Sequence, residues 1–268
     1  IKLAHGGGGQ LTVELIEQVI LPSLKSTQLP GGLTDAATLD GFDGKLAFTT
    51  DSYVIQPLEF PGGDIGELAV CGTVNDLAVA GAKPKALSMG LILEEGLEIA
   101  LLRRVLESAG KAAQQAGVEI VTGDTKVVEH GGVDGIIINT AGVGAMIPAA
   151  ELGFDRIAEG DAIVLSGALG EHGLAVMSQR EGLSFTAELE SDCAAINCLT
   201  ESLLAELGSD VKFMRDPTRS GLAATLVEVS EAARVDVELD EAALPLNKTA
   251  RAASEMLGLD LLSVANEG

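Results

Sequence analysis

The chain has 268 residues, of which 47% are hydrophobic and 21% charged, enough apolar material to bury one large core or two ordinary ones. Forty Asp and Glu against 17 Lys and Arg give a formal net charge of −23 at pH 7, and this negative field excludes nucleic acids and anionic membrane surfaces as partners. Aromatic residues make up only 3%, with no Trp and one Tyr, so a ligand must be held mainly by polar groups and backbone.

The first half of the chain alternates strand and helix patterns. Residues 11–24 carry apolar side chains at helical spacing and predict a short helix that stops at Pro22. Apolar runs between turn residues predict four strands, and stretches with 3.6-residue spacing predict two further helices, the second ending at Gly117. The strands are expected at 45–55, 85–93, 118–127 and 134–146, and the two helices at 64–82 and 101–117.

The pattern resets between residues 148 and 159, where we place a domain boundary. This predicts an N-terminal domain over 1–150 and a C-terminal α/β domain over 151–268. The last predicted strand, at 261–265, would form a sheet edge with no covering helix, so we expect the natural chain to continue past Gly268. In the second domain we predict a strand from Asp161 that runs into a glycine-rich turn and a helix, strands at 211–216, 235–239 and 261–265, and helices at 192–207, 220–233 and 248–257.

The cysteines, the N-terminal segment and the length of the apolar runs all predict a cytoplasmic protein. Cys71, Cys193 and Cys198 form no CxxC pair and lie among apolar residues, which is typical of core thiols in a reducing compartment. The start, IKLAHGGGGQ, lacks the charged and apolar regions of a signal peptide, and no apolar run approaches the ~20 residues needed to span a bilayer.

Several aspartates stand at predicted strand ends or in turns, where carboxylates converge easily. Mg²⁺ takes one or two carboxylates together with phosphate oxygens, so such a cation makes a polyphosphate site possible in an acidic protein. The alternative is that each Asp caps a helix or a turn, the commonest role of this residue. The residues are Asp35, Asp51, Asp76, Asp124 and Asp216, and the capping interpretation is weakest for Asp51, Asp76 and Asp124, whose segments are otherwise apolar.

A glycine run before the first helix is a second candidate, for phosphate binding by backbone N–H groups. It lacks the GK[ST] ending of a P-loop and no strand precedes it, so a flexible terminal loop is an equally good interpretation. His5 beside the run carries little weight as an acid or base. The run consists of Gly6, Gly7, Gly8 and Gly9.

Basic residues near these acids offer anion contacts. Lys126 follows Asp124 by two residues and would point to the same side of an extended strand, where it binds either that carboxylate or a phosphate. Arg215 and Arg219 flank a Pro- and Gly-containing turn in RDPTRSG, which is either an anion site or a helix start.

Eight motifs are spread along nearly the whole chain. They are LAHGGGGQL, FTTDSYVIQPLEFPGGDIGELAVCGTVNDLAVAGAKP, LILEEGL, GVEIVTGDTKVV, INTAGVG, VLSGALGEHG, RDPTRSGL and ANEG. Taken together, they resemble those of the HypE family of hydrogenase maturation proteins, the carbamoyl dehydratases. This family is related to aminoimidazole ribonucleotide synthetase, selenophosphate synthetase and thiamine monophosphate kinase.

The resemblance implies a two-domain PurM-like α/β fold and a homodimer, in which four strands from each N-terminal domain form a barrel with ATP and Mg²⁺ in the groove beside it. In this family a C-terminal Cys, in a Pro-Arg-Ile-Cys ending, receives a carbamoyl group from the carbamoyltransferase HypF. ATP then activates the carbamoyl oxygen for loss of water, and the cyanide passes to the iron of nickel–iron hydrogenase with the scaffold proteins HypC and HypD.

The resemblance also implies roles for single residues. Metal and phosphate contacts fall to Asp51, Asp76 and Asp124, with Asp35 as a further metal ligand, and Asp216, Asn75 and Gly6 to Gly9 as further nucleotide contacts. Glu267 of ANEG is implied as the base that removes the amide protons, and Lys126 as the residue that orients the carbamoyl or phosphate oxygen.

The sequence departs from the family at one point. It ends at Gly268 and none of its three Cys lies in such a tail, so as written we expect it to bind ATP without turning over. The alternatives are a sister ATP-dependent kinase or synthetase of the same fold, and a catalytically silent scaffold subunit of the maturation complex.

Overall fold

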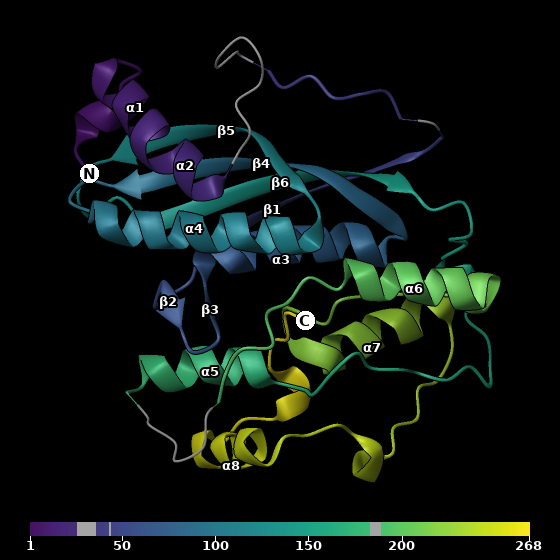
Figure 1. Ribbon diagram of the computed structural model, residues 1–268. Helices are drawn as coiled ribbons and strands as arrows, with labels where there is room; N and C mark the ends of the chain where they lie inside the picture. Colours follow the sequence, from purple (N-terminus) through teal and green to yellow (C-terminus); the bar gives the residue numbers. More distant parts are fainter. Residues whose placement is uncertain (26–35, 43, 183–188) are drawn as a thin grey trace.

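A four-stranded sheet organises the first half of the molecule. The computed structural model describes residues 1–25, 36–42, 44–182 and 189–268 (Figure 1). The strand order is β1-β6-β4-β5, with β4 and β5 parallel and the other neighbours antiparallel. The strands are β1 (Leu46–Tyr53), β4 (Ala82–Glu94), β5 (Glu119–Val128) and β6 (Ile136–Met146), so all four strands predicted for this half are confirmed.

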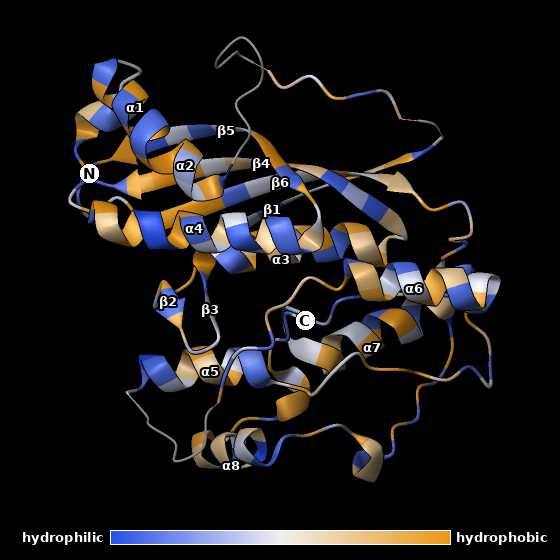
Figure 2. Ribbon diagram, viewed as in Figure 1, coloured by the Kyte–Doolittle hydropathy of each residue, from blue (hydrophilic) through white to orange (hydrophobic). Residues whose placement is uncertain are grey.

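Two helices, α3 (Ile65–Val79) and α4 (Ile99–Ala116), cover one face of this sheet (Figure 1). Asp64 starts α3 because its carboxylate accepts two backbone N–H groups of the first turn, at 2.7 and 3.0 Å. In α4, hydrophilic and hydrophobic bands alternate, as expected of an amphipathic helix (Figure 2). The α4 helix ends at Gly117, which takes the left-handed conformation with a φ of 69°, as predicted.

The strands bury one face and expose the other. Along β1, Tyr53 points into the core, whereas Leu46 and Phe48 point outward and stay exposed, Phe48 with 73% of its surface. The core between the sheet and its helices contains fully buried side chains from both layers. Among them are Ile65, Val70, Leu93, Leu102, Leu106 and Ile138.

The first helix continues past Pro22, and the predicted stop is therefore wrong. It consists of α1 (Gln10–Leu15), a five-residue π turn (Ile16–Ile20) and α2 (Leu21–Leu24), and it ends at Lys25 with a φ of 52°. Ile20 and Leu21 keep helical dihedral angles and the Leu21 N–H donates to the Ile16 carbonyl, so the chain passes through Pro22 without leaving the helix.

The second half contains helices linked by extended segments. The predicted helix 248–257 is confirmed as α8, and the other helices begin within a few residues of their expected positions, except that 192–196 is not helical. The helices are α5 (Glu171–Arg180), α6 (Asn197–Leu207), α7 (Gly221–Ala233) and α8 (Lys248–Leu257).

No strand occurs among the described residues of 151–268, so the prediction of four strands there is wrong. The segments from 161, at 211–216 and at 235–239 are irregular, and Leu261–Ser263 forms a 3₁₀ turn. The segments make isolated backbone hydrogen bonds, such as Gly153 N–H to Lys212 O at 2.9 Å, in place of a ladder. Apolar character favours a strand only where a neighbouring strand supplies that ladder.

The two halves pack closely against each other. Helix α6 lies against α3 (Figure 1). The Asn197 side chain donates a hydrogen bond of 2.9 Å to the Ala116 carbonyl at the end of α4. A small hairpin of the first half, β2 (Glu59–Phe60) and β3 (Gly63–Asp64), reaches down to α5. The described chain contains no helix long and apolar enough to cross a bilayer.

Candidate nucleotide and metal site

Four carboxylates converge between the two halves of the molecule. They come from β1 (Asp51), the last turn of α3 (Asp76), the loop before α7 (Asp216) and the C-terminal ANEG segment (Glu267), whose end lies beneath α3 (Figure 1). Burial, followed by the charges of Asp192 and of the other three carboxylates, raises the pKa of Glu267 to about 8. Sequence and structure therefore agree on the nearness of four of the predicted site residues.

The geometry of β1 and α3 positions the first two acids. Thr49 and Asp51 are two residues apart on β1 and point to the same side, toward α3. The Thr49 hydroxyl donates to Asp76 at 2.7 Å, and Arg219 lies 3.5 Å from an Asp51 oxygen. Burial raises the pKa of Asp76, with Thr49 opposing the shift and the Asp51 charge adding to it.

The loop RDPTRSG brings the third acid to the same place. Burial first, and then the charge of Asp76, raises the pKa of Asp216 to about 6. The loop is fastened to the C-terminal segment because the Asn266 side chain donates to the Pro217 carbonyl at 3.0 Å. Both arginines face the cluster, since Arg219 lies 3.5 Å from Asp51 and Arg215 lies 3.9 Å from Asp216 as well as 3.1 Å from Glu228 on α7.

Backbone hydrogen bonds hold Glu267 in position. Its amide N–H donates to both carboxylate oxygens of Asp192, at 3.1 and 3.2 Å, and its carbonyl accepts from the Asn75 side chain at 3.2 Å. The other amide hydrogen of Asn75 goes to the Ala194 carbonyl, at 2.9 Å. The buried Asn75 side chain, a nucleotide contact by resemblance, is therefore engaged within the protein, where it links α3 to the C-terminal segment.

A buried hydroxyl chain lies beneath the cluster. The Tyr53 hydroxyl is 3.4 Å from that of Thr73, which in turn contacts the hydroxyl of Thr140 on β6. Burial strongly raises the pKa of Tyr53, and the charges of Asp51, Glu267 and Asp76 add to it. Sequence reasoning missed Tyr53 and Asp192; the only Tyr of a chain poor in aromatics, two residues after a candidate Asp, was the available signal.

The remaining candidates lie elsewhere in the same chain. Asp124 pairs in register with Gly90, and through β6 with Ser52, so it lies on the outer face of the sheet, opposite Asp51. The Lys126 ammonium is 3.2 Å from Asp124, which confirms that the two point to the same side.

The glycine run begins at Gly6, which lies in space beside the end of β5. A Cβ at Gly6 would come within 2.5 Å of the Val127 backbone nitrogen, so only glycine fits so close to this strand. The Gly8 N–H donates to Thr12 at 2.9 Å. His5 accepts the Lys2 N–H at 2.8 Å and so closes the turn at the N-terminus. Gly6 thus packs against Val127, the residue that follows Lys126 on β5.

The acids suit a hard divalent cation chemically, since all of them supply oxygen ligands. Burial first, and then the neighbouring negative charges, raises the pKa of Asp76, Asp216 and Glu267, and a cation there would offset both effects. Asp35 lies outside the described residues. Within the described part of the chain, no three His, Cys, Asp or Glu side chains are already gathered as ligands around one point.

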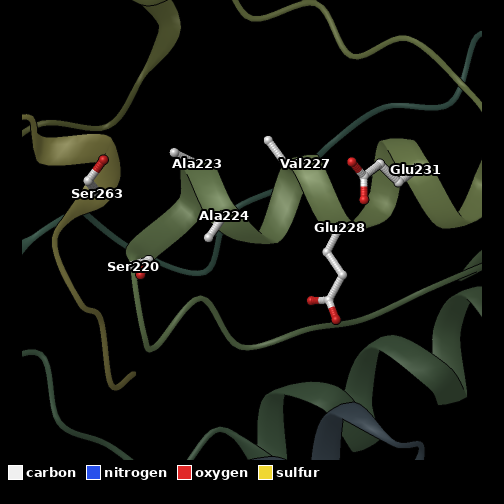
Figure 3. A pocket seen from close by; sticks show the side chains of 7 residues that line it. All are labelled: Ser220, Ala223, Ala224, Val227, Glu228, Glu231 and Ser263. Carbon is white, nitrogen blue, oxygen red and sulfur yellow. The ribbon is translucent and has the colours of Figure 1, made fainter.

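A shallow cavity of about 410 Å³ lies apart from this cluster, along α7 (Figure 3). Glu228 and Glu231 project from the helix, and Ser263 lies across from its first turn. Among the described residues its lining contains no Lys or Arg, so it offers nothing to a polyphosphate.

The comparisons with known proteins agree with one another. Residues 33–146 match the family described as AIR synthase related protein, N-terminal domain, and residues 158–268 match the C-terminal domain. The carbamoyl dehydratase HypE of Rhizobium leguminosarum bv. viciae is 47% identical over 268 residues, which cover all of this chain and 76% of that protein.

Solved structures show the same relationship. A crystal structure of hydrogenase maturation protein HypE in complex with ATP aligns with a TM-score of 0.95 at 48% identity, covering 100% of this chain and 79% of that one. A structure of a HypE–HypF complex aligns with a TM-score of 0.81 at 46% identity, covering 86% and 75%. The expected two-domain PurM-like fold is thereby confirmed, and the chain belongs to the HypE family of the AIR synthase related proteins.

Proposed function

We propose that this protein carries out the ATP-dependent dehydration of an S-carbamoyl group on a C-terminal Cys to a thiocyanate, as a step in hydrogenase maturation that supplies cyanide ligands to the iron. The observation that carries the proposal is the placement of Glu267 beside Asp51, Asp76 and Asp216. A proton acceptor and a set of cation-binding oxygens then share one half-buried space, which is what removal of water from an amide requires.

The residues divide the chemistry between them. Asp51, Asp76 and Asp216 would hold Mg²⁺, which would neutralise the charge of the transferring phosphoryl group. ATP would supply that group to the carbamoyl oxygen, which then leaves as phosphate, with ADP as the second product. Glu267 would take the two protons of the carbamoyl nitrogen one after the other, passing the first to solvent before the second leaves as the carbon–nitrogen triple bond forms. A pKa of about 8 suits Glu267 to proton transfer near neutral pH.

The outer face of the sheet supports a homodimer. Leu46 and Phe48 are exposed there, together with Asp124 and Lys126. Because these two charged residues lie opposite the four acids, a nucleotide site that includes all the predicted residues would draw on two copies of the chain. We propose that the outer faces of two copies pack together and that Asp124, Lys126 and the glycine run of one copy reach the acids of the other around the edge strand β1, which carries Asp51.

The protein partners follow from the family. A complex of HypE with HypF has been solved for a relative that is 46% identical. We propose that this chain likewise receives its carbamoyl group from HypF, and that HypC and HypD accept the cyanide.

Calorimetric titration with Mg²⁺ and ATP tests the nucleotide part of the proposal. The wild-type chain is expected to bind ATP only with Mg²⁺ present, and Asp76→Ala to weaken binding at least about tenfold, because a ligand carboxylate is lost. Asp236→Ala removes an exposed Asp outside the cluster and should bind as wild type does.

Two outcomes would contradict the proposal. A wild-type chain without Mg²⁺-dependent ATP affinity would favour the silent scaffold. Transfer of the phosphoryl group to a soluble metabolite would favour the sister kinase.

A further inference from the structure

Asp192 holds the residue that the proposed mechanism uses as a base. Both of its carboxylate oxygens accept the Glu267 N–H, and the Gly268 amide also lies against this carboxylate. Gly268 packs so tightly that a Cβ there would come within 1.9 Å of the Asp192 carbonyl oxygen. The peptide plane that carries the Glu267 side chain is therefore fixed from the Asp192 side.

The segment that carries Asp192 is itself anchored to both halves of the molecule. The Ser191 N–H donates to the Pro61 carbonyl of the β2–β3 hairpin at 2.8 Å, and the Ser191 hydroxyl contacts His172 at 2.8 Å. On the other side, the Ile196 N–H donates to Asn75 at 2.9 Å. An anchor of this kind transmits the position of α3, which carries Asp76, to Glu267.

A purely structural role does not account for this carboxylate. Helix α6 begins at Asn197 with no side-chain cap, so Asp192 does not start it. An Asn side chain has a single acceptor oxygen, so it could take over only part of the contacts that this carboxylate makes with the Glu267 and Gly268 amides. Asp192 is half-buried, and burial raises its pKa to about 6, so the acid is retained at a cost in stability.

We propose that Asp192 is a positioning residue for Glu267, holding its backbone so that the Glu267 carboxyl group faces Asp51, Asp76 and Asp216. The inference rests on the proposed dehydratase function. It predicts that loss of Asp192 slows the proton-transfer chemistry and leaves ATP binding intact, since the three aspartates are attached to other segments.

The test measures steady-state dehydration of a peptide that ends in S-carbamoyl cysteine, supplied to this chain with ATP and Mg²⁺. Asp192→Ala should lower kcat by roughly 10- to 100-fold, because a misplacement of about 1 Å costs that much, while the KM for ATP changes less than about twofold. Asp192→Asn keeps an acceptor for the Glu267 N–H and should recover much of the loss. Asp236→Ala, an exposed Asp in the same half, is the matched control.

Hydrogen exchange at the Glu267 amide measures how firmly Asp192 holds this residue, independently of whether the protein is a dehydratase. Asp192→Ala should accelerate exchange at this amide more than in the core strand β4, where unchanged protection shows that the fold is intact. An unchanged Glu267 amide, or a variant with wild-type kcat, would overturn the positioning role. Accelerated exchange together with an inactive wild-type chain would leave the positioning role standing and remove the dehydratase.

Discussion

At the scale of single residues, four carboxylates share a half-buried space although their repulsion opposes folding. The pKa of Glu267 rises to about 8 and that of Asp216 to about 6, in both cases mainly because burial disfavours the charged form. Such an arrangement lowers the stability of the free protein, which is expected of a site shaped for a cation and a proton acceptor.

The raised pKa of Glu267 predicts a specific pH dependence of stability. Between about pH 5 and about pH 8, native Glu267 keeps a proton that the unfolded chain has already released, so the free energy of unfolding should fall as pH rises through this window. Urea unfolding in the presence of EDTA measures the slope. Glu267→Gln should flatten it above about pH 7, where Asp216 and Asp192 have largely titrated.

Added Mg²⁺ provides the second arm of this experiment. A cation favours the ionised carboxylates and should reduce the fall in stability for the wild-type chain. A slope that is equal in the wild type and in Glu267→Gln would contradict the shared carboxylate space.

At the scale of elements, the contact between β1 and α3 sets the floor of the site. A Cβ at Gly72 would come within 2.3 Å of the Tyr53 hydroxyl oxygen, so the helix can approach the strand only through glycine. Tyr53 lies two residues after Asp51, and Gly72 one turn before Asp76, so this close approach brings the two acids together.

Gly72→Ala should lower the free energy of unfolding by about 1–3 kcal/mol, because the added methyl group overpacks this contact. Thermal or urea unfolding measures the loss. Adding Tyr53→Phe should restore part of it, since the hydroxyl makes the nearest contact. Gly167→Ala, where a Cβ meets nothing within 4 Å, is the control, and an equal loss there would contradict the explanation.

Sequence patterns predicted the secondary structure of the first half better than that of the second. The strands at β1, β4, β5 and β6 were predictable because each carries its own apolar period and pairs within the first half. The strand predicted at 235–239 failed because a strand depends on a partner that no local pattern reveals. The helix end predicted at Pro22 was wrong because a π turn lies just before this residue, a feature that the apolar pattern does not reveal.

At the scale of the whole molecule, the predicted site residues fall into two groups on opposite faces of the sheet. Sequence motifs identified members of both, Asp76 in one and Asp124 in the other, because each lies in a segment that is otherwise apolar. Their separation followed only from strand register, and the role of Asp192 only from tertiary hydrogen bonds. A second copy packed on the outer face would reunite the groups.

Phe48→Asp tests this arrangement. Phe48 exposes 73% of its surface, so the change should dissociate the proposed dimer with little effect on the fold of each chain. Sedimentation analysis measures the association, and circular dichroism the fold. Val227→Asp places the same charge at another exposed apolar position, on α7, and should leave the association unchanged. A wild-type chain that is monomeric at high concentration would contradict the shared site.

The most direct measurement of the central claim is mass spectrometry of a peptide ending in S-carbamoyl cysteine after incubation with this protein. The peptide is expected to lose the mass of one water only when ATP and Mg²⁺ are both present, and to keep its mass when Glu267→Gln replaces the wild type. ATP hydrolysis with an unchanged peptide mass, or loss of water that persists in Glu267→Gln, would contradict the assignment of this carboxylate cluster to dehydration.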